Sequence, residues 1–189
     1  VTLCWVRMLH NFNLHDERGP STWEDALTGI AAALLHDTGY LKKHDDANGT
    51  GAKYTFIHES RGCRIAEEFL GFLSWSADSI ASVQRLIAAT GPRAVVEAIP
   101  FLSIKEERLA QMLATADFLA QMSDPQYLDK LPSLYAEFEE SDEFRGLDVK
   151  DRPFPDLKSL ISQTPVFWEK FVKPRLEKEY GGVYHYLNH

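Results

Sequence analysis

Three His-Asp dipeptides are the residues of this sequence best suited to chemistry, because imidazole and carboxylate groups together bind catalytic divalent metals. They are His15-Asp16, His36-Asp37 and His44-Asp45. The first and third lie among Gly, Asn, Lys and Glu residues, and we interpret both as solvated loop residues. The middle pair directly follows the apolar run from Ile30 to Leu35, and it is therefore the candidate site.

Helical spacing predicts that Asp37 lies on an apolar face. It comes four residues after Ala33 and seven after Ile30, so a continuous helix would project these side chains from one side. A carboxylate buried there costs several kcal/mol unless a partner or a metal compensates. The alternative is a solvated Asp37 beyond the helix end, but His36 adds a second ligand-type group at the same place. We predict that His36 and Asp37 bind a metal and that Asp37 is also catalytic.

Two later residues fit the same pattern. Asp117 lies four residues after Leu113, at the edge of an apolar helical face, and we predict it as a third metal ligand. The alternatives for Asp117 are a surface residue or a buried hydrogen-bond acceptor. His58 is expected to begin a helix, where the free amide groups favour anions, so it is a candidate for substrate binding or for a second metal. A capping or core histidine is an equal alternative for His58.

Helical periodicity dominates the elements that must position these residues, so the predicted fold class is all-α. Ser21 to Glu24 and Ser103 to Glu106 match the capping box that begins a helix, and Gly39 is expected to end the second helix as its C-cap. A polar loop is expected over residues 43–53 and a connector over 146–155. The expected helices cover residues 1–11, 21–39, 58–72, 78–89, 103–122, 127–144 and 157–180.

Composition excludes several classes of protein. The formal charge is −8 and no basic block occurs, which argues against bulk nucleic acid as a partner. No apolar run reaches the ~18 residues of a membrane span, and the first residues lack the features of a signal peptide. Cys4 and Cys63 have no metal-type spacing and are expected to be free thiols. We expect a cytoplasmic protein of one domain over residues 1–189, with no membrane association.

The motifs together resemble a known family. The stretch from Ala31 to Tyr40, which contains His36-Asp37-Thr38-Gly39, is followed by Ile57-His58-Glu59-Ser60 and later by Ala114-Thr115-Ala116-Asp117. This order resembles the HD-domain superfamily of metal-dependent phosphohydrolases, and the likeness covers about residues 1–122. The resemblance implies a bundle of about five core helices around a metal, with residues 123–189 as a helical extension.

The first histidine of the family pattern has no clear counterpart. The family places it at the start of the first helix, whereas the first helix expected here already includes Val1. Either that ligand lies upstream of the sequence or His10 supplies it. His10 lies at the far end of the same helix, ~14 Å from its start at 1.5 Å per residue. We therefore predict that His10 is not a ligand, that Val1 lies near His36, and that the site is one protein ligand short.

The ligand set predicts the chemistry. Imidazole and carboxylate ligands suit Mn, Fe, Co, Ni or Zn, and such an ion activates water for hydrolysis of a small phosphate ester. Four nearby cations are either phosphate contacts or ordinary solvated side chains: Lys42, Lys43, Lys53 and Arg61. Two alternatives stay open. One is a regulatory module with an incomplete metal site, and the other is a di-metal oxygenase or lyase on the same fold.

Overall fold

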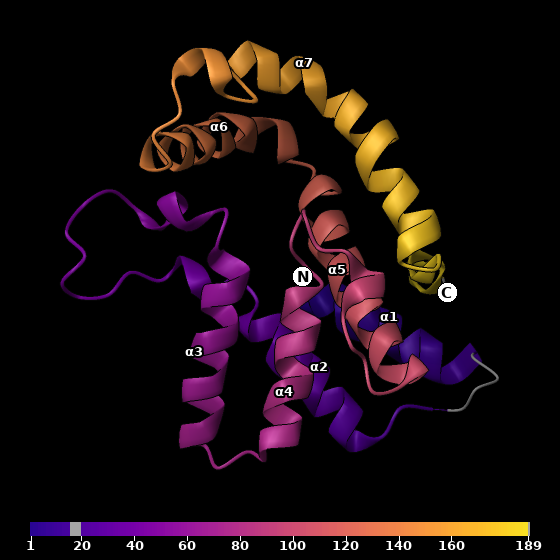
Figure 1. Ribbon diagram of the computed structural model, residues 1–189. Coiled ribbons are helices and arrows are strands. Elements are labelled where there is room, and N and C mark those ends of the chain that lie inside the picture. Colours follow the sequence, from indigo (N-terminus) through magenta and orange to yellow (C-terminus); the bar gives the residue numbers. More distant parts are fainter. Residues whose placement is uncertain (16–19, 189) are drawn as a thin grey trace.

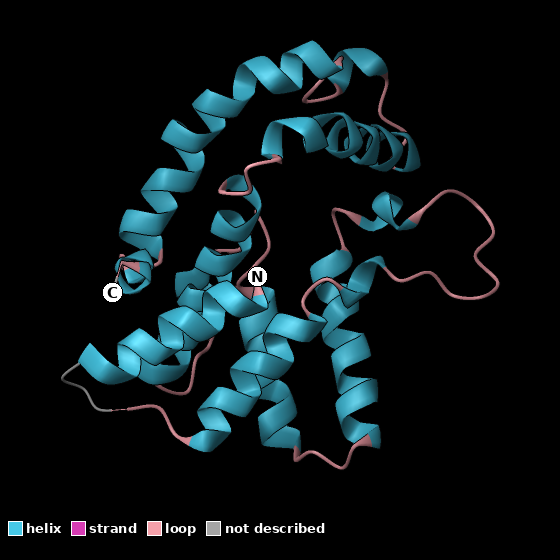
Figure 2. Ribbon diagram, turned by 180° about the vertical axis from the view of Figure 1, so that it is seen from behind, coloured by secondary structure: helices cyan, strands magenta, loops and turns pink. Residues whose placement is uncertain are grey.

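The computed structural model describes residues 1–15 and 20–188, and this part of the chain contains helices and loops but no strand (Figures 1 and 2). The predicted all-α class is confirmed. The α-helices are α1 (Thr2–His15), α2 (Trp23–Leu35), α3 (His58–Phe72), α4 (Ala77–Ala88), α5 (Ile104–Met122), α6 (Tyr127–Phe144) and α7 (Leu157–Phe167). Short 3-10 helices occur at η1 (Thr38–Tyr40), η2 (Gly51–Tyr54), η3 (Val96–Ala98), η4 (Val149–Asp151) and η7 (Val183–Leu187).

Helices α1 to α5 form a bundle, and α6 and α7 arch over one end of it (Figure 1). Beyond α7 the chain continues through two π-helical segments, η5 (Trp168–Val172) and η6 (Arg175–Glu179). It returns to the bundle at η7, which packs against α1 and α5. The C-terminal segment is therefore helical, as expected, but it covers the bundle end at which α2 finishes and α3 begins.

Trp5 is the central core residue of the bundle. Its side chain is fully buried and its indole Nε1–H donates to the Leu109 carbonyl of α5 over 3.2 Å. A Cβ on Gly29 of α2 would lie 1.9 Å from the Trp5 ring, so α2 needs a glycine where this ring packs. Trp5 thus joins α1, α2 and α5. Its hydrogen bond to Leu109 also means that the buried indole N–H is not left unpaired.

Two expected helix starts are confirmed with small changes. The N-cap of α2 is Thr22, whose hydroxyl accepts from the Asp25 backbone N–H while Asp25 accepts from the Thr22 N–H. The capping box is therefore one residue later than the predicted Ser21-Glu24 pair. At α5, Ser103 caps as predicted, but the Glu106 carboxylate accepts from the Leu102 N–H and pairs with Arg85.

Helical spacing in the sequence predicts an apolar stripe of Trp23, Leu27, Ile30 and Leu34 on α2 and one of Ile65, Ala66, Phe69 and Phe72 on α3, and both predictions are partly wrong. Trp23 is 74% exposed and Phe72 is 85% exposed, whereas the buried residues of α2 are Gly29, Ala32 and Ala33. Large apolar side chains dominated the predicted stripe, but the close packing of Trp5 leaves room only for small residues on the inner face of α2. The inward face of α5 is confirmed, with Leu109, Met112, Leu113 and Ala116 buried.

Gly39 does not act as the predicted C-cap. Helix α2 ends at Leu35 with His36 as its C-cap, and Gly39 lies within η1 without a positive φ. Position 39 instead needs a glycine because two backbone segments approach each other closely there. A Cβ on Gly39 would lie 1.8 Å from the carbonyl oxygen of His58, so the chain after α2 contacts the backbone at the start of α3.

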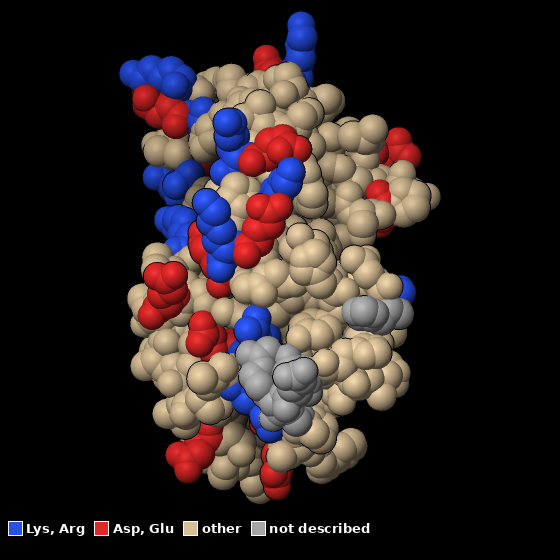
Figure 3. Space-filling view, turned by 90° about the vertical axis from the view of Figure 1, so that its right-hand side faces the viewer, with Lys and Arg blue, Asp and Glu red and all other residues tan. Residues whose placement is uncertain are grey.

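No helix in the described part of the chain is both long and apolar enough to span a membrane. On the face shown in Figure 3, Lys and Arg side chains are interspersed with Asp and Glu side chains, and apolar or neutral surface separates them.

We predict that Gly39→Ala destabilises the protein by about 1–3 kcal/mol, because the added methyl meets backbone atoms that cannot move aside. Gly71→Ala in α3 is the control. A Cβ there meets nothing within 4 Å, and removing a helical glycine stabilises by about 0.5–1 kcal/mol. Urea unfolding of both variants measures the difference. A Gly39→Ala variant as stable as wild type would contradict the close approach.

Candidate metal centre

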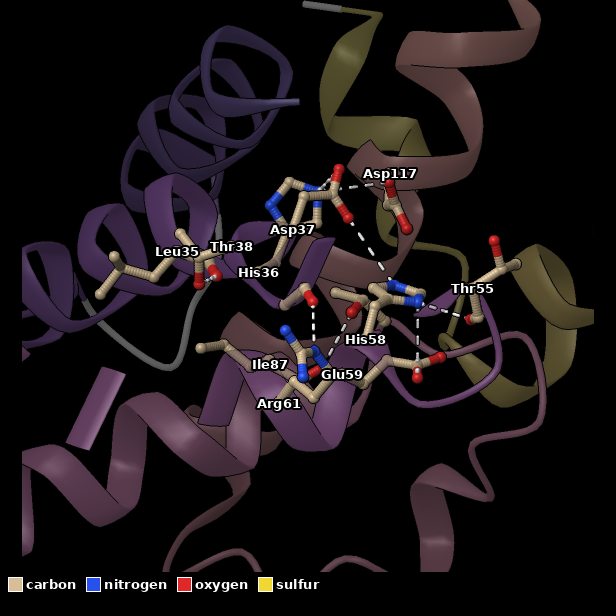
Figure 4. A network of polar contacts seen from close by, with 12 residues as sticks. Leu35, His36, Asp37, Thr38, Thr55, His58, Glu59, Arg61, Ile87 and Asp117 are labelled. Atoms are coloured by element: carbon tan, nitrogen blue, oxygen red, sulfur yellow. Dashed lines mark hydrogen bonds and ion pairs between the residues drawn. The ribbon is translucent and has the colours of Figure 1, made fainter. Parts of the chain in front are cut away.

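The four predicted site residues lie together at one end of the bundle (Figure 4). His36 is the C-cap of α2, Asp37 follows it, His58 begins α3 and Asp117 lies in α5. His36 Nε2 lies 3.2 Å from Asp37 Oδ2 and 3.5 Å from Asp117 Oδ1. His58 Nε2 lies 3.7 Å from Asp37 Oδ1. Asp37 therefore sits between two imidazoles, with one carboxylate oxygen toward each.

Both histidines are held by backbone carbonyls on their other ring nitrogen. His36 Nδ1 lies 3.0 Å from the Ala33 carbonyl oxygen, and His58 Nδ1 lies 2.7 Å from that of Thr55. A carbonyl oxygen only accepts, so each Nδ1 carries the proton and donates it. Each Nε2 is consequently presented to the carboxylates. Metal-binding histidines commonly have this arrangement, in which the outer contact fixes the tautomer and the ring orientation.

The Nε2 atom of His36 is buried between two carboxylates. Its side chain is 7% exposed, and Nε2 is buried with no hydrogen-bond partner despite two carboxylates close by. Ligands ~2.0–2.1 Å from one tetrahedral ion lie about 3.3 Å apart, close to the two His36–carboxylate distances. Among the described residues, no group of three or more His, Cys, Asp or Glu is arranged so that it could hold a metal ion.

The carboxylates control the protonation of His36. Burial opposes the charged imidazole, but the contacts with Asp117 and Asp37 outweigh it and raise the pKa of His36 to about 10. Desolvation would raise the pKa of Asp37, yet the contact with His36 and the charges of His36 and His58 lower it. In the metal-free protein a proton on Nε2 thus takes the place of a cation between two carboxylates.

Asp37 differs from the sequence prediction in its surroundings. Because α2 ends at Leu35, Asp37 lies beyond the helix and its side chain is 57% exposed, not buried on the apolar face. The spacing argument assumed that the helix continued. Asp117 is 31% exposed at the edge of the buried face of α5, where its spacing placed it.

Contacts around His58 hold its ring and also join the start of α3 to the chain that follows Asp37. Tyr40 stacks on it with ring centroids 4.4 Å apart and an interplanar angle of 17°. Arg61, one turn further along α3, donates from Nε to the Gly39 carbonyl and from a terminal nitrogen to the Leu41 carbonyl, both over 2.7 Å. These contacts bind the chain after Asp37 to the beginning of α3, so the two halves of the site keep their relative position.

A cavity of about 750 Å³ opens above these residues. Asp37, Tyr40, His58 and Asp117 line it from the bundle, and the covering helices add Leu134, Glu137 and Phe138 from α6 and Phe167 from α7. Sequence reasoning missed Glu137, although its spacing beside Leu134 and Phe138 resembles that of Asp117 beside its apolar neighbours. Desolvation, followed by the charges of Asp37 and Glu140, raises the pKa of Glu137.

The cations predicted near the site do not line this cavity. Lys53 is buried and binds Asp46 and the Asn48 carbonyl, while Lys42 donates to Gly49 and Arg61 to Gly39 and Leu41. The interpretation as a solvated side chain is wrong for Lys53, which is buried, whereas Lys42 and Arg61 are partly exposed and Lys43 is exposed. Lys130 of α6 does line the cavity, and it forms an ion pair with Asp124 over 2.5 Å.

The remaining predictions concern chain segments near the site. Val1 lines the cavity together with Asp37, the neighbour of His36, whereas His10 is exposed on α1 and does not line the cavity. His44 and Asp45 are exposed loop residues, as predicted. Asp16 lies outside the described residues. Cys4 and Cys63 are free thiols, and burial raises the pKa of Cys63 to about 11.

A family model described as Npun_R2479-like matches residues 1–181. The chain belongs to this family. No curated protein and no solved structure matches the chain significantly. The Npun_R2479-like match covers α6 and α7 as well as the bundle, so the floor and the cover of the cavity both belong to the family unit.

We predict that the metal-free protein loses stability as the pH rises from about 6.5 to 10. The pKa of His36 is about 10 in the folded state and ~6.5 in an unfolded chain, so its protonation stabilises the fold fully below pH 6.5. This contribution is lost as the pH passes the folded pKa. Thermal melts in a chelator should show the loss in wild type and a smaller one in His36→Asn, whose amide can keep the bond to Ala33. Identical pH profiles would contradict the assignment.

Proposed function

We propose that this protein is a metal-dependent phosphohydrolase that acts on a small phosphate ester. The observation that carries the proposal is the buried Nε2 of His36, without a hydrogen-bond partner and directed at Asp37 and Asp117. A second observation supports it. The cavity beside this atom has a volume within the range of small-molecule sites and is lined by both carboxylates. The resemblance to the HD-domain superfamily is consistent with the same reaction.

The proposed metal ligands are His36, Asp37 and Asp117, which suit a divalent transition metal such as Mn, Fe, Co, Ni or Zn. A metal of this kind lowers the pKa of a bound water and polarises a phosphoryl oxygen. The negative cavity makes such an ion necessary for phosphate, because its carboxylates would otherwise repel the substrate.

The side chains have separate roles in the proposed reaction. Asp37 offers one oxygen toward His36 and the other toward His58, so a single carboxylate can bind metal and also orient the attacking water. The water oxygen bonds to phosphorus, the ester P–O bond breaks, and the alcohol leaves with a proton. We assign His58 in its doubly protonated form to the phosphate oxygens, because its Nε2–H could then donate to them on the opposite side of Asp37 from His36.

We predict that Asp37→Ala lowers kcat for a generic phosphate ester on the order of 10²–10⁴-fold, since it removes a ligand and the group that orients water. Asp45→Asn is the control, because Asp45 belongs to an exposed His-Asp pair in a loop and should retain full activity. Metal content by mass spectrometry accompanies the assay. Unchanged activity in Asp37→Ala would place the chemistry elsewhere, and a wild-type protein with neither metal nor activity would favour a non-catalytic module.

We predict that His58→Asn keeps the wild-type metal content and raises KM about tenfold, because the asparagine amide can still donate to Thr55 while the Nε2 contact to phosphate is lost. Titration with Mn²⁺ and steady-state kinetics measure the two effects separately. Loss of one metal equivalent in this variant would instead make His58 a ligand of a second metal.

A further inference from the structure

The charges around the cavity leave one carboxylate without a counterion. The charged side chains of the lining are four carboxylates (Asp37, Asp117, Asp124 and Glu137) and one ammonium group (Lys130). Lys130 pairs with Asp124, and a divalent ion at the proposed metal centre would balance Asp37 and Asp117. Glu137 remains. Among the described residues, no Lys, Arg or His forms an ion pair with Glu137, and the charges that raise its pKa, after desolvation, are those of Asp37 and Glu140.

Aromatic and apolar side chains line the same cavity as Glu137. Phe138 follows it on α6 and Leu134 lies one turn earlier, while Phe118 and Phe167, whose ring centroids are 6.4 Å apart, also line the cavity. The faces of aromatic rings attract cations, and quaternary ammonium groups are recognised by such surfaces together with a carboxylate. A cavity lined by both an unpaired carboxylate and phenylalanine rings therefore matches an organic cation.

A wholly anionic substrate fits this cavity poorly. Its phosphate belongs at the metal centre on the floor, and any further negative group would approach Glu137 and Asp124. A neutral organic group would leave Glu137 desolvated without compensation. An ammonium group removes both costs, because it neutralises Glu137 and packs its methylene or methyl groups against the phenylalanines.

We propose that the substrate is a phosphate ester whose organic group carries a primary or quaternary ammonium, and that Glu137 determines this specificity. The proposal rests on the proposed phosphohydrolase function for the position of the phosphate. Hydrolysis would add water across the ester bond and release an amino alcohol and inorganic phosphate. Glu137 contacts the cationic end of the substrate and takes no part in bond breaking.

A matched pair of esters tests the specificity. Phosphocholine and 3,3-dimethylbutyl phosphate have nearly the same shape but differ by one positive charge. The metal-loaded full chain should hydrolyse phosphocholine with a kcat/KM about tenfold higher. In Glu137→Gln this ratio should fall to about one. Asp129→Asn, which removes an exposed carboxylate from the same helix outside the cavity, should keep the wild-type ratio.

Titration of choline and of 3,3-dimethylbutanol by calorimetry separates this proposal from the proposed function, since neither compound carries phosphate. Choline binding by wild type that is lost in Glu137→Gln would support the ammonium site even if no ester were hydrolysed. Equal kcat/KM values for the two esters, or choline binding equal in both proteins, would overturn it. Loss of bound metal in Glu137→Gln would also overturn it, because Glu137 would then be a metal ligand.

Discussion

The contact between the backbones of Gly39 and His58 is the constraint on which the site depends. A side chain at position 39 would overlap the His58 carbonyl, so the chain leaving α2 can approach the start of α3 only with glycine there. Gly62 also allows the chain after α2 to lie close to α3, because a Cβ on it would lie 3.0 Å from the His36 carbonyl oxygen. Arg61 then closes the junction by donating to the Gly39 and Leu41 carbonyls. As a result, Asp37 is held between His36 and His58, which are 22 residues apart in sequence.

The end of α2 also prepares His36 for its role. A helix leaves its last carbonyl groups without intrahelical partners, and the Ala33 carbonyl receives the Nδ1–H of His36 instead. Helix α2 stops at Leu35, and Asp37 therefore turns toward the cavity. The same helix end also fixes the tautomer of the His36 imidazole. The resulting Nε2 lies between two carboxylates, a position that suits a proton and, under the proposed function, would also suit a divalent metal. Competition between the two follows directly from this geometry.

The sequence was sufficient for features that depend on local pattern. Helix periodicity predicted the all-α class and the bounds of α6, and the inward spacing of Asp117 placed it at the site. Local pattern failed where packing between distant segments decided the outcome. The apolar stripe of α2 was misassigned because Trp5 occupies the space in front of Gly29, and Gly39 was misread as a helix cap because its partner is 19 residues later. Lys53 was misjudged for the same reason, since its partners are the Asp46 carboxylate and the Asn48 carbonyl, which only the folded loop brings near.

Two parts of the chain surround the cavity: the bundle, and the cover formed by α6 and α7. The bundle supplies His36, Asp37, His58 and Asp117, whose orientation is fixed by backbone carbonyls and close glycine contacts. The cover supplies Glu137, Phe138 and Phe167, which lie on helices that contact the bundle mainly through η2 and the returning C-terminal segment. Thr50, beside η2, ties the two together by donating its backbone N–H and its hydroxyl to Glu140 of α6. Under the proposed function, the bundle residues would determine the reaction. The residues of α6 and α7 would determine the choice of substrate, and they could change without altering the proposed ligands.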